Sequence, residues 1–274
     1  MQTETILIPV KIIADTGETV ATSVEVRRTT DADGSKHDEL TLHADKADQI
    51  AESLRDSGAN TVIIAIPDPQ DEVKERKMAI SAAAAQRLAE GSVNLELNLP
   101  HAGLALSAES VRGLENDILF RFVPVKKDDE REAIEQRAKK ELANLAHASD
   151  RNIEAVGRPL QIETNMQGRP VTLVLQVDVA SVSSGQFEDL GVYIEHSDGT
   201  IELLSGELIP YGESGRLGLR FAVSQFSTFA VVRIEGWGQS RTIGVEHDAV
   251  DLRKSFTTRI YKGMPITPLD RTRR

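Results

Sequence analysis

The chain has 274 residues, of which 40% are hydrophobic and 27% are charged, a composition typical of a folded globular protein rather than a disordered one. Its formal net charge of −11 argues against a nucleic-acid partner, because phosphate binding requires a concentrated basic surface. The sequence contains no cysteine, which excludes disulfide bonds, thiolate metal sites and cysteine nucleophiles.

The sequence carries no signal for membrane insertion or export. No run of 18 apolar residues occurs, so we expect no membrane span. The first residues, MQTETILIPVK, lack the basic region and the long apolar region of a signal peptide. We therefore expect either an intracellular protein or an internal piece of a longer chain.

A β-hairpin is predicted over residues 22–43, with its turn at Asp33-Gly34. The same stretch contains DADGSKHD, whose carboxylates Asp31, Asp33 and Asp38 offer a candidate weak calcium site. It lacks the twelve-residue loop and the closing glutamate of a calcium-binding hand, and a solvated turn is the favoured interpretation.

Three segments share a strand, a helix start, an amphipathic helix and a second strand, at residues 40–68, 78–100 and 104–125. Ser81 and Ser107 occupy the same N-cap position, 26 residues apart, and His43 takes that place in the first copy, where we expect it to be structural. Gly58 and Gly91 are predicted to end helices in the left-handed conformation. The alternation of Val93, Leu95, Leu97 and Leu99 with polar residues predicts a half-buried strand.

A long charged helix is predicted from Lys127 to about Ala148, with an i, i+4 ion pair between Glu135 and Lys139. Its apolar face consists of Ile134, Ala138, Leu142 and Leu145. Beyond Asp150 the pattern changes to short strands separated by turns, one of them at Asp198-Gly199, which is typical of an antiparallel sheet or sandwich.

The sequence therefore predicts an α+β fold: an N-terminal part of repeated strand-helix-strand units and a C-terminal antiparallel β-sheet or β-sandwich. We expect a repeat module at 1–126, a connecting helix at 127–150, an antiparallel β domain at 151–236 and a linker or tail at 237–274. In the last strand, QFSTFAVV, we expect Phe226 and Phe229 to pack at the end of the sheet and close the fold rather than line a pocket.

No nucleophile elbow, phosphate-binding loop or dinucleotide-binding fingerprint occurs, and none of the six histidines has the spacing of a metal site. A pair of facing carboxylates, as in glycosidases, stays open as a third reading. We expect no catalytic residue, no cofactor and no metal. The repeated Gly-Arg-Pro sequence places Arg158 and Arg169 as candidate contacts to a partner or anion, and the alternative is two strand-entry turns with solvated or locally paired arginines.

Four stretches carry a resemblance to a known family: RRTTDADG, GRPLQIETNMQGRPVTL, LGVYIEHSDGTIELLSGELIPY and QFSTFAVV, in this order within residues 20–235. Together they resemble a module found upstream of S-layer homology domains in cell-surface proteins and large secreted glycosidases of Paenibacillus-type bacteria. The resemblance implies a non-catalytic spacer or assembly module that is extracellular, at the cell surface or cell wall. The expected S-layer homology repeats do not follow, since residues 245–274 contain no complete copy.

The partners that the resemblance implies are cell-wall or S-layer components, polysaccharide among them, with no nucleic acid and no membrane span. This chain would then lack its own signal peptide and anchor. The alternative is a module of a secreted multimodular glycosidase that binds carbohydrate or cell-wall polymer, for which an exposed aromatic strip or a calcium site is needed.

Overall fold

The computed structural model describes residues 2–14, 17–55, 57–145, 151–212 and 216–238. They belong to one compact unit, Met1–Gly238. Its strands and helices form one large, mostly antiparallel sheet with a few helices, which confirms the predicted α+β class. Of the predicted tail, residues 239–274 lie outside the described residues.

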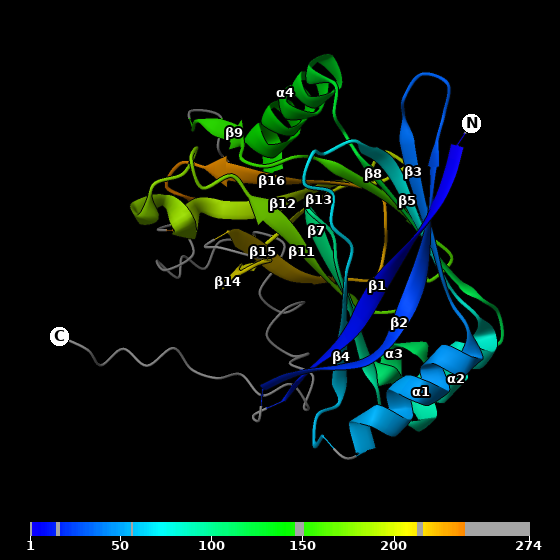
Figure 1. The fold of residues 1–274 in the computed structure, drawn as a ribbon. Helices are drawn as coiled ribbons and strands as arrows, with labels where there is room; N and C mark the ends of the chain where they lie inside the picture. The colour runs from blue at the N-terminus through cyan, green and yellow to red at the C-terminus, as the bar shows by residue number, and fades with distance from the viewer. Residues whose placement is uncertain (1, 15–16, 56, 146–150, 213–215, 239–274) are drawn as a thin grey trace. The chain divides into compact units, whose positions relative to one another are not determined.

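A long hairpin forms the middle of the sheet (Figure 1), built from β1 (Gln2–Ala14) and β2 (Gly17–Thr30). Inward-facing residues such as Val10, Ile12 and Val26 are at most 1% exposed, because side chains on a strand alternate between its two faces. On the other face, Leu7 and Ile13 stay more than half exposed, at 65% and 56%.

The three repeats place their strands on both sides of this hairpin. The strands and helices are β3 (Lys36–Leu42), α1 (Ala44–Arg55), β4 (Thr61–Ala65), β5 (Val73–Ile80), α2 (Ala82–Glu90), β6 (Asn94–Asn98), β7 (Ala102–Leu106), α3 (Ala108–Val111) and β8 (Ile118–Pro124). The first repeat puts β3 beside β2 and β4 beside β1, and the second adds β5 and β6 in parallel outside them. The third runs in the opposite sense, so β7 pairs with β6 and β8 with β5, both antiparallel.

The helix caps follow the sequence at four of the five expected places. Ser81 and Ser107 accept the backbone N–H groups of the residues three further on, at 3.2 and 3.0 Å, as predicted. The His43 carbonyl accepts the N–H groups of Lys46 and Ala47 in the first turn of α1, while its side chain is exposed. Gly58 is left-handed, with φ of 71°.

The prediction for Gly91 was wrong. Its φ is −76°, and the left-handed residue is Ser92, at φ 52°. A Cβ at position 91 would lie 3.3 Å from the Cβ of Ala51 and 3.2 Å from the carbonyl oxygen of Arg87. Glycine therefore fits the close approach of α2 to α1 here, and its backbone angle is one that any residue can adopt.

The remaining strands extend both halves of the sheet. They are β9 (Ile153–Ala155), β10 (Leu160–Thr164), β11 (Val171–Val177), β12 (Leu190–Glu195), β13 (Ile201–Leu204), β14 (Glu207–Pro210), β15 (Leu217–Val223) and β16 (Thr228–Ile234), with a 3₁₀ turn η1 (Ser184–Asp189). The order of the sheet is β13-β12-β16-β10-β8-β5-β3-β2-β1-β4-β6-β7-β11-β15-β14, with β9 beside β16. Strands of the predicted repeat module and of the predicted β domain thus pair directly, β8 with β10 and β7 with β11.

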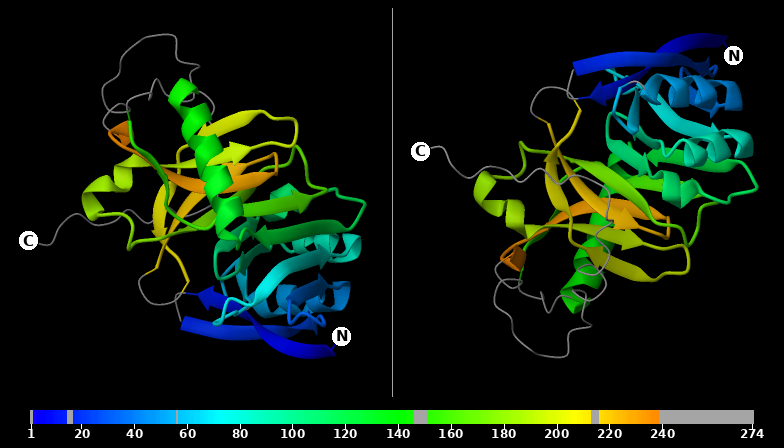
Figure 2. Two further views of the ribbon diagram at one scale, coloured as in Figure 1. Left: turned by 90° about the horizontal axis from the view of Figure 1, so that it is seen from above. Right: turned by 90° about the horizontal axis from the view of Figure 1, so that it is seen from below.

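Residues of both halves form one hydrophobic core, which includes Leu40, Ile80, Leu95, Leu173 and Phe229. A second cluster lies under α4 (Asp128–Leu145), whose buried residues Ile134, Ala138 and Leu142 confirm the predicted apolar face. The side chain of Leu145 lies outside the described ones. Figure 2 shows α4 lying across β16, and Figure 1 shows it at the opposite end from α1–α3.

The burial of the two phenylalanines in QFSTFAVV follows from the position of β16 in the sheet. Phe229 is 0% and Phe226 7% exposed, which confirms that both are buried. Packing at the end of the sheet was wrong for Phe229, because β16 lies between β12 and β10 and is covered on both faces.

Candidate functional site

The loop that joins β4 to β5, residues 66–72, meets two groups of charged side chains. The first, which we call the buried ion network, consists of Arg28, Asp38, Asp68 and Arg76. Arg28 donates from Nε and Nη2 to the two carboxylate oxygens of Asp38, at 2.7 and 2.8 Å. Arg76 donates from Nη2 to Oδ2 of Asp68 at 2.7 Å, and its Nε lies 3.6 Å from Oδ2 of Asp38.

The strand register builds this network. Arg28 and Asp38 are cross-strand partners in β2 and β3, and Asp38 and Arg76 are partners in β3 and β5. Asp38 and Arg76 are only 2% and 4% exposed. Two positive and two negative groups therefore pair in one row, which limits the cost of removing each charge from water.

Asp68 also fixes the backbone of the loop. Its carboxylate accepts the N–H groups of Glu72 and Val73, each at 3.0 Å. Burial disfavours its charged form, but these hydrogen bonds and the one from Arg76 outweigh burial and hold the pKa of Asp68 below its usual range. The hydrogen bond to Asp38 likewise raises the pKa of Arg28.

The second group, the Asp71 cluster, consists of Asp71, His101, Lys126 and Arg158. Asp71 has a left-handed backbone, with φ of 53°. Its Oδ1 lies 3.1 Å from Nε2 of His101 and 3.1 Å from Nζ of Lys126, and its Oδ2 accepts from Nη1 of Arg158. Burial opposes the charge on Asp71, but the hydrogen bonds from Arg158, Lys126 and His101 are stronger and keep its pKa below its usual range.

The ring of His101 lies between a donor and an acceptor. Its Nε2 is 3.1 Å from both Oδ1 of Asp71 and Nη1 of Arg158, and its Nδ1 is 3.2 Å from Oε1 of Gln176. A protonated ring donates to Asp71, whereas a neutral ring with its proton on Nδ1 accepts from Arg158. Burial lowers the pKa of His101 despite the nearby Asp71, and so favours the neutral ring.

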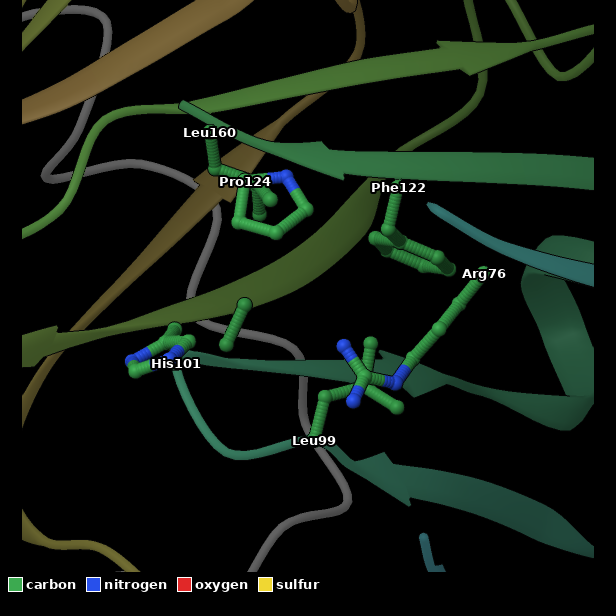
Figure 3. Close-up of a pocket in the computed structure, with 7 residues that line it drawn as sticks. Arg76, Leu99, His101, Phe122, Pro124 and Leu160 are labelled. Carbon is green, nitrogen blue, oxygen red and sulfur yellow. The ribbon is translucent and has the colours of Figure 1, made fainter. Parts of the chain in front are cut away.

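A small cavity separates the two groups (Figure 3). It is lined by Arg76, Leu99, His101, Phe122 and Leu160, among others, and its volume is about 10 Å³. This is about the space of one water molecule. Arg76 Nε is buried beside it without a hydrogen bond. The cavity can hold a water but not a substrate.

A much larger hollow lies on the outward face of β3, β5, β8 and β10. This groove has a volume of about 540 Å³. Its outward-facing lining combines charged residues with small or apolar ones, namely Glu39, Thr41, Lys77, Ala79, Leu119, Arg121, Glu163 and Asn165. Leu119 is 51% exposed there. The groove is therefore open to solvent and lined by both charged and apolar groups.

The three carboxylates of the candidate calcium site take separate roles. Asp31 lies 3.2 Å from Nε2 of His37, Asp33 caps the N–H of Ser35 at 2.9 Å, and Asp38 belongs to the buried ion network. The turn itself forms as predicted, with Gly34 left-handed at φ 83°. Among the described residues no group of three or more His, Asp or Glu side chains is arranged to hold a metal ion. Calcium binding stays a prediction.

Both arginines of the Gly-Arg-Pro sequences make contacts inside the chain. Arg158 belongs to the Asp71 cluster. Arg169 donates from Nη1 to the carbonyl oxygens of Ser110 and Arg112 at the end of α3, at 3.1 and 2.9 Å. Each thus ties the loops of the C-terminal strands to the repeats, and contact with a further partner stays a prediction.

Sequence reasoning missed Arg76, His101 and Asp71. Arg76 is the one buried charge in β5, where the alternation of RKMAI puts Arg76, Met78 and Ile80 inside. A charged residue at an inward position could have indicated a buried ion pair. Nothing local links Asp71 to Arg158, which is 87 residues away.

The comparisons with known proteins leave the family open. No family model matches the chain. No curated protein matches its sequence. Within the described part of the chain, no helix has the length and apolar character that crossing a bilayer requires.

Proposed function

We propose that the chain is a non-catalytic structural module, a spacer or assembly piece of a bacterial cell-surface protein. The location rests on the resemblance of its sequence to modules that precede S-layer homology domains. The structural role rests on the charged side chains of the buried ion network and the Asp71 cluster, which bind one another and the backbone.

The observation that carries this proposal is the pairing of those charges with one another and with the backbone. Asp68 is bound by Arg76 and by two N–H groups, and Asp71 by three side chains from three other parts of the chain. A general acid or base needs access to a substrate atom. Here each carboxylate is already bound by cations or backbone N–H groups of the same chain, which supports a role in bracing the loop at 66–72.

Two experiments test the proposal. Intact cells of the source bacterium are treated with a protease, and the chain is followed with an antibody; a surface module is degraded while a cytosolic marker stays intact. Protection of the chain alongside that marker would overturn the location.

Purified chain incubated with cell-wall polysaccharide should release no reducing ends, and release that is abolished by Asp71→Asn would overturn the non-catalytic role.

The groove is the one observation that favours the alternative, binding of a wall glycan. Its hydroxyl and charged groups can hydrogen-bond to sugars, and Leu119 offers an apolar contact. Its only aromatic lining residue, Phe120, is 2% exposed and cannot serve as a stacking platform. Saturable binding of wall polysaccharide, lost in Leu119→Asp, would promote this reading.

A further inference from the structure

The outward face of β2, β3, β5, β8 and β10 carries charges in a fixed order. Register partners across the strands are Arg27 with Glu39, Glu39 with Lys77, Lys77 with Arg121, and Arg121 with Glu163. Arg27 with Glu39 and Arg121 with Glu163 also form ion pairs within the chain. We call these five residues the charged ladder. Their side chains are 62%, 42%, 53%, 37% and 67% exposed, so the whole ladder reaches the surface.

The signs along the ladder are plus, minus, plus, plus, minus. When a second copy is laid on it in reverse order, Arg27 faces Glu163 and Glu39 faces Arg121, and both pairs occur twice. Only Lys77 meets its own equivalent, and Glu75, which is shared with Arg121, lies 3.1 Å from Lys77 in each copy and offsets part of that charge. If the second copy were laid on in the same order, each of the five positions would face its own equivalent and like charges would meet, which is unfavourable.

The reverse order corresponds to one symmetry operation. A two-fold axis that runs along β5 between two facing sheets exchanges the two ends of the ladder and keeps the strands aligned. Aligned sheets pack about 10 Å apart, which long charged side chains from both sides can span. The next row then places Leu119 of one copy over the short Thr41 of the other, and Ala79 over Ala79, because these residues are also cross-strand neighbours.

The rest of the molecule makes this face the favourable one for contact between copies. The chain has a net charge of −11, so most approaches of two copies are repulsive. The ladder holds three positive and two negative groups and is therefore close to neutral. A polyanion such as a nucleic acid is a poor match, since Glu39 and Glu163 would face its phosphates.

We propose that two copies of this chain pack face to face through the groove and the charged ladder, related by a two-fold axis along β5. The contact combines four charge pairs along the ladder with the neighbouring row of Leu119, Thr41 and Ala79. This inference does not rest on the proposed cell-surface role and would hold for the chain in any location.

The test uses two full-length variants with ladders of one sign. In the first, Glu39→Lys and Glu163→Lys make every ladder position positive; in the second, Arg27→Glu, Lys77→Glu and Arg121→Glu make every position negative. Sedimentation velocity measures association of the wild type, of each variant and of their mixture. We expect the wild type to dimerise, each variant alone to bind itself at least about tenfold more weakly, and the mixture to form a one-to-one complex.

The mixture also controls for folding, because a variant that fails to fold cannot restore a specific complex. A matched control, Glu109→Lys with Glu132→Lys, changes the same number of exposed acidic residues away from the ladder and should leave dimerisation unchanged. A wild type that stays monomeric at its highest soluble concentration would overturn the proposal. So would variants that associate like the wild type, or a wild-type monomer that binds wall polysaccharide through Leu119.

Discussion

Nη2 of Arg76 lies 2.7 Å from Oδ2 of Asp68, and both side chains are buried, at 4% and 7% exposure. The pair holds the loop at 66–72 from inside the molecule, because the carboxylate of Asp68 also accepts the backbone N–H groups of Glu72 and Val73. Several measurable properties depend on this loop and on the core around it.

Arg76→Leu should destabilise the protein by about 3–5 kcal/mol at pH 7, because it leaves the carboxylates of Asp68 and Asp38 short of a buried partner. Urea denaturation measures the loss. The deficit should shrink as the pH falls toward 4, since an unpaired buried carboxyl takes up a proton more readily. Lys74→Leu, which removes an exposed partner of Asp33, is the control and should change stability by less than about 0.5 kcal/mol. Equal effects of both variants would contradict the role of Arg76.

Phe229→Ala should cost about 3–5 kcal/mol in chemical denaturation, the usual range for a fully buried phenylalanine. Phe229 is 0% exposed and its ring centroid lies 5.9 Å from that of Phe221. Phe187→Ala is the matched control. Because Phe187 is only partly buried, this substitution should lower the free energy of unfolding clearly less than Phe229→Ala does. A loss below about 1 kcal/mol at Phe229 would refute its place in the core.

Stability should fall as the pH is lowered through the range of histidine titration, and His101 should be one cause. Its pKa is lowered in the folded chain, so between that value and the unfolded value of about 6.5 the unfolded chain binds more protons. The stability that the neutral His101 ring contributes is fully present above pH 6.5 and is lost as the pH falls through this window. Asp71 and Arg158 face the ring and remain charged throughout it. Denaturation midpoints at pH 8 and 5.5 should differ less in His101→Gln than in the wild type, and an unchanged difference would contradict this assignment.

Glu96→Gln should stabilise the protein at pH 7. Burial raises the pKa of Glu96, and the charge of Arg220 only partly compensates. A carboxyl whose pKa is raised on folding reduces stability above its unfolded pKa, so removing the charge removes that penalty. The gain in denaturation midpoint should disappear as the pH falls below the unfolded pKa of about 4.3, where the carboxyl becomes neutral in both states. Glu163→Gln, at a side chain 67% exposed, should show no such gain at pH 7, and a similar gain there would argue against the burial of Glu96 as the cause.

Much of the local structure could be predicted because its causes lie within a few residues. The hydroxyls of Ser81 and Ser107 cap helices, Asp33-Gly34 and Asp198-Gly199 turn hairpins, and strand alternation puts Leu95 and Leu97 inside. Each depends on backbone geometry that neighbouring side chains control.

The site could not be predicted in the same way. The Asp71 cluster joins residues 30 and 87 positions apart, and the buried ion network depends on β3 pairing in parallel with β5. The charged ladder likewise exists only because five strands from different parts of the chain share one register. Pairing between distant strands is decided by how the whole core packs, which no local pattern records.

The sequence alone determined the helix starts at Ser81 and Ser107, the turns at Asp33-Gly34 and Asp198-Gly199 and the α+β class, because propensity, capping and alternation act locally. Only the tertiary structure decided that each repeat sends its two strands to opposite sides of the β1–β2 hairpin, and that β16 lies inside the sheet. It also decided that Gly91 serves contact between helices rather than a left-handed turn. These features arise from contacts between residues far apart in the chain, whose free energy exists only once the two halves of the sheet have come together around one core.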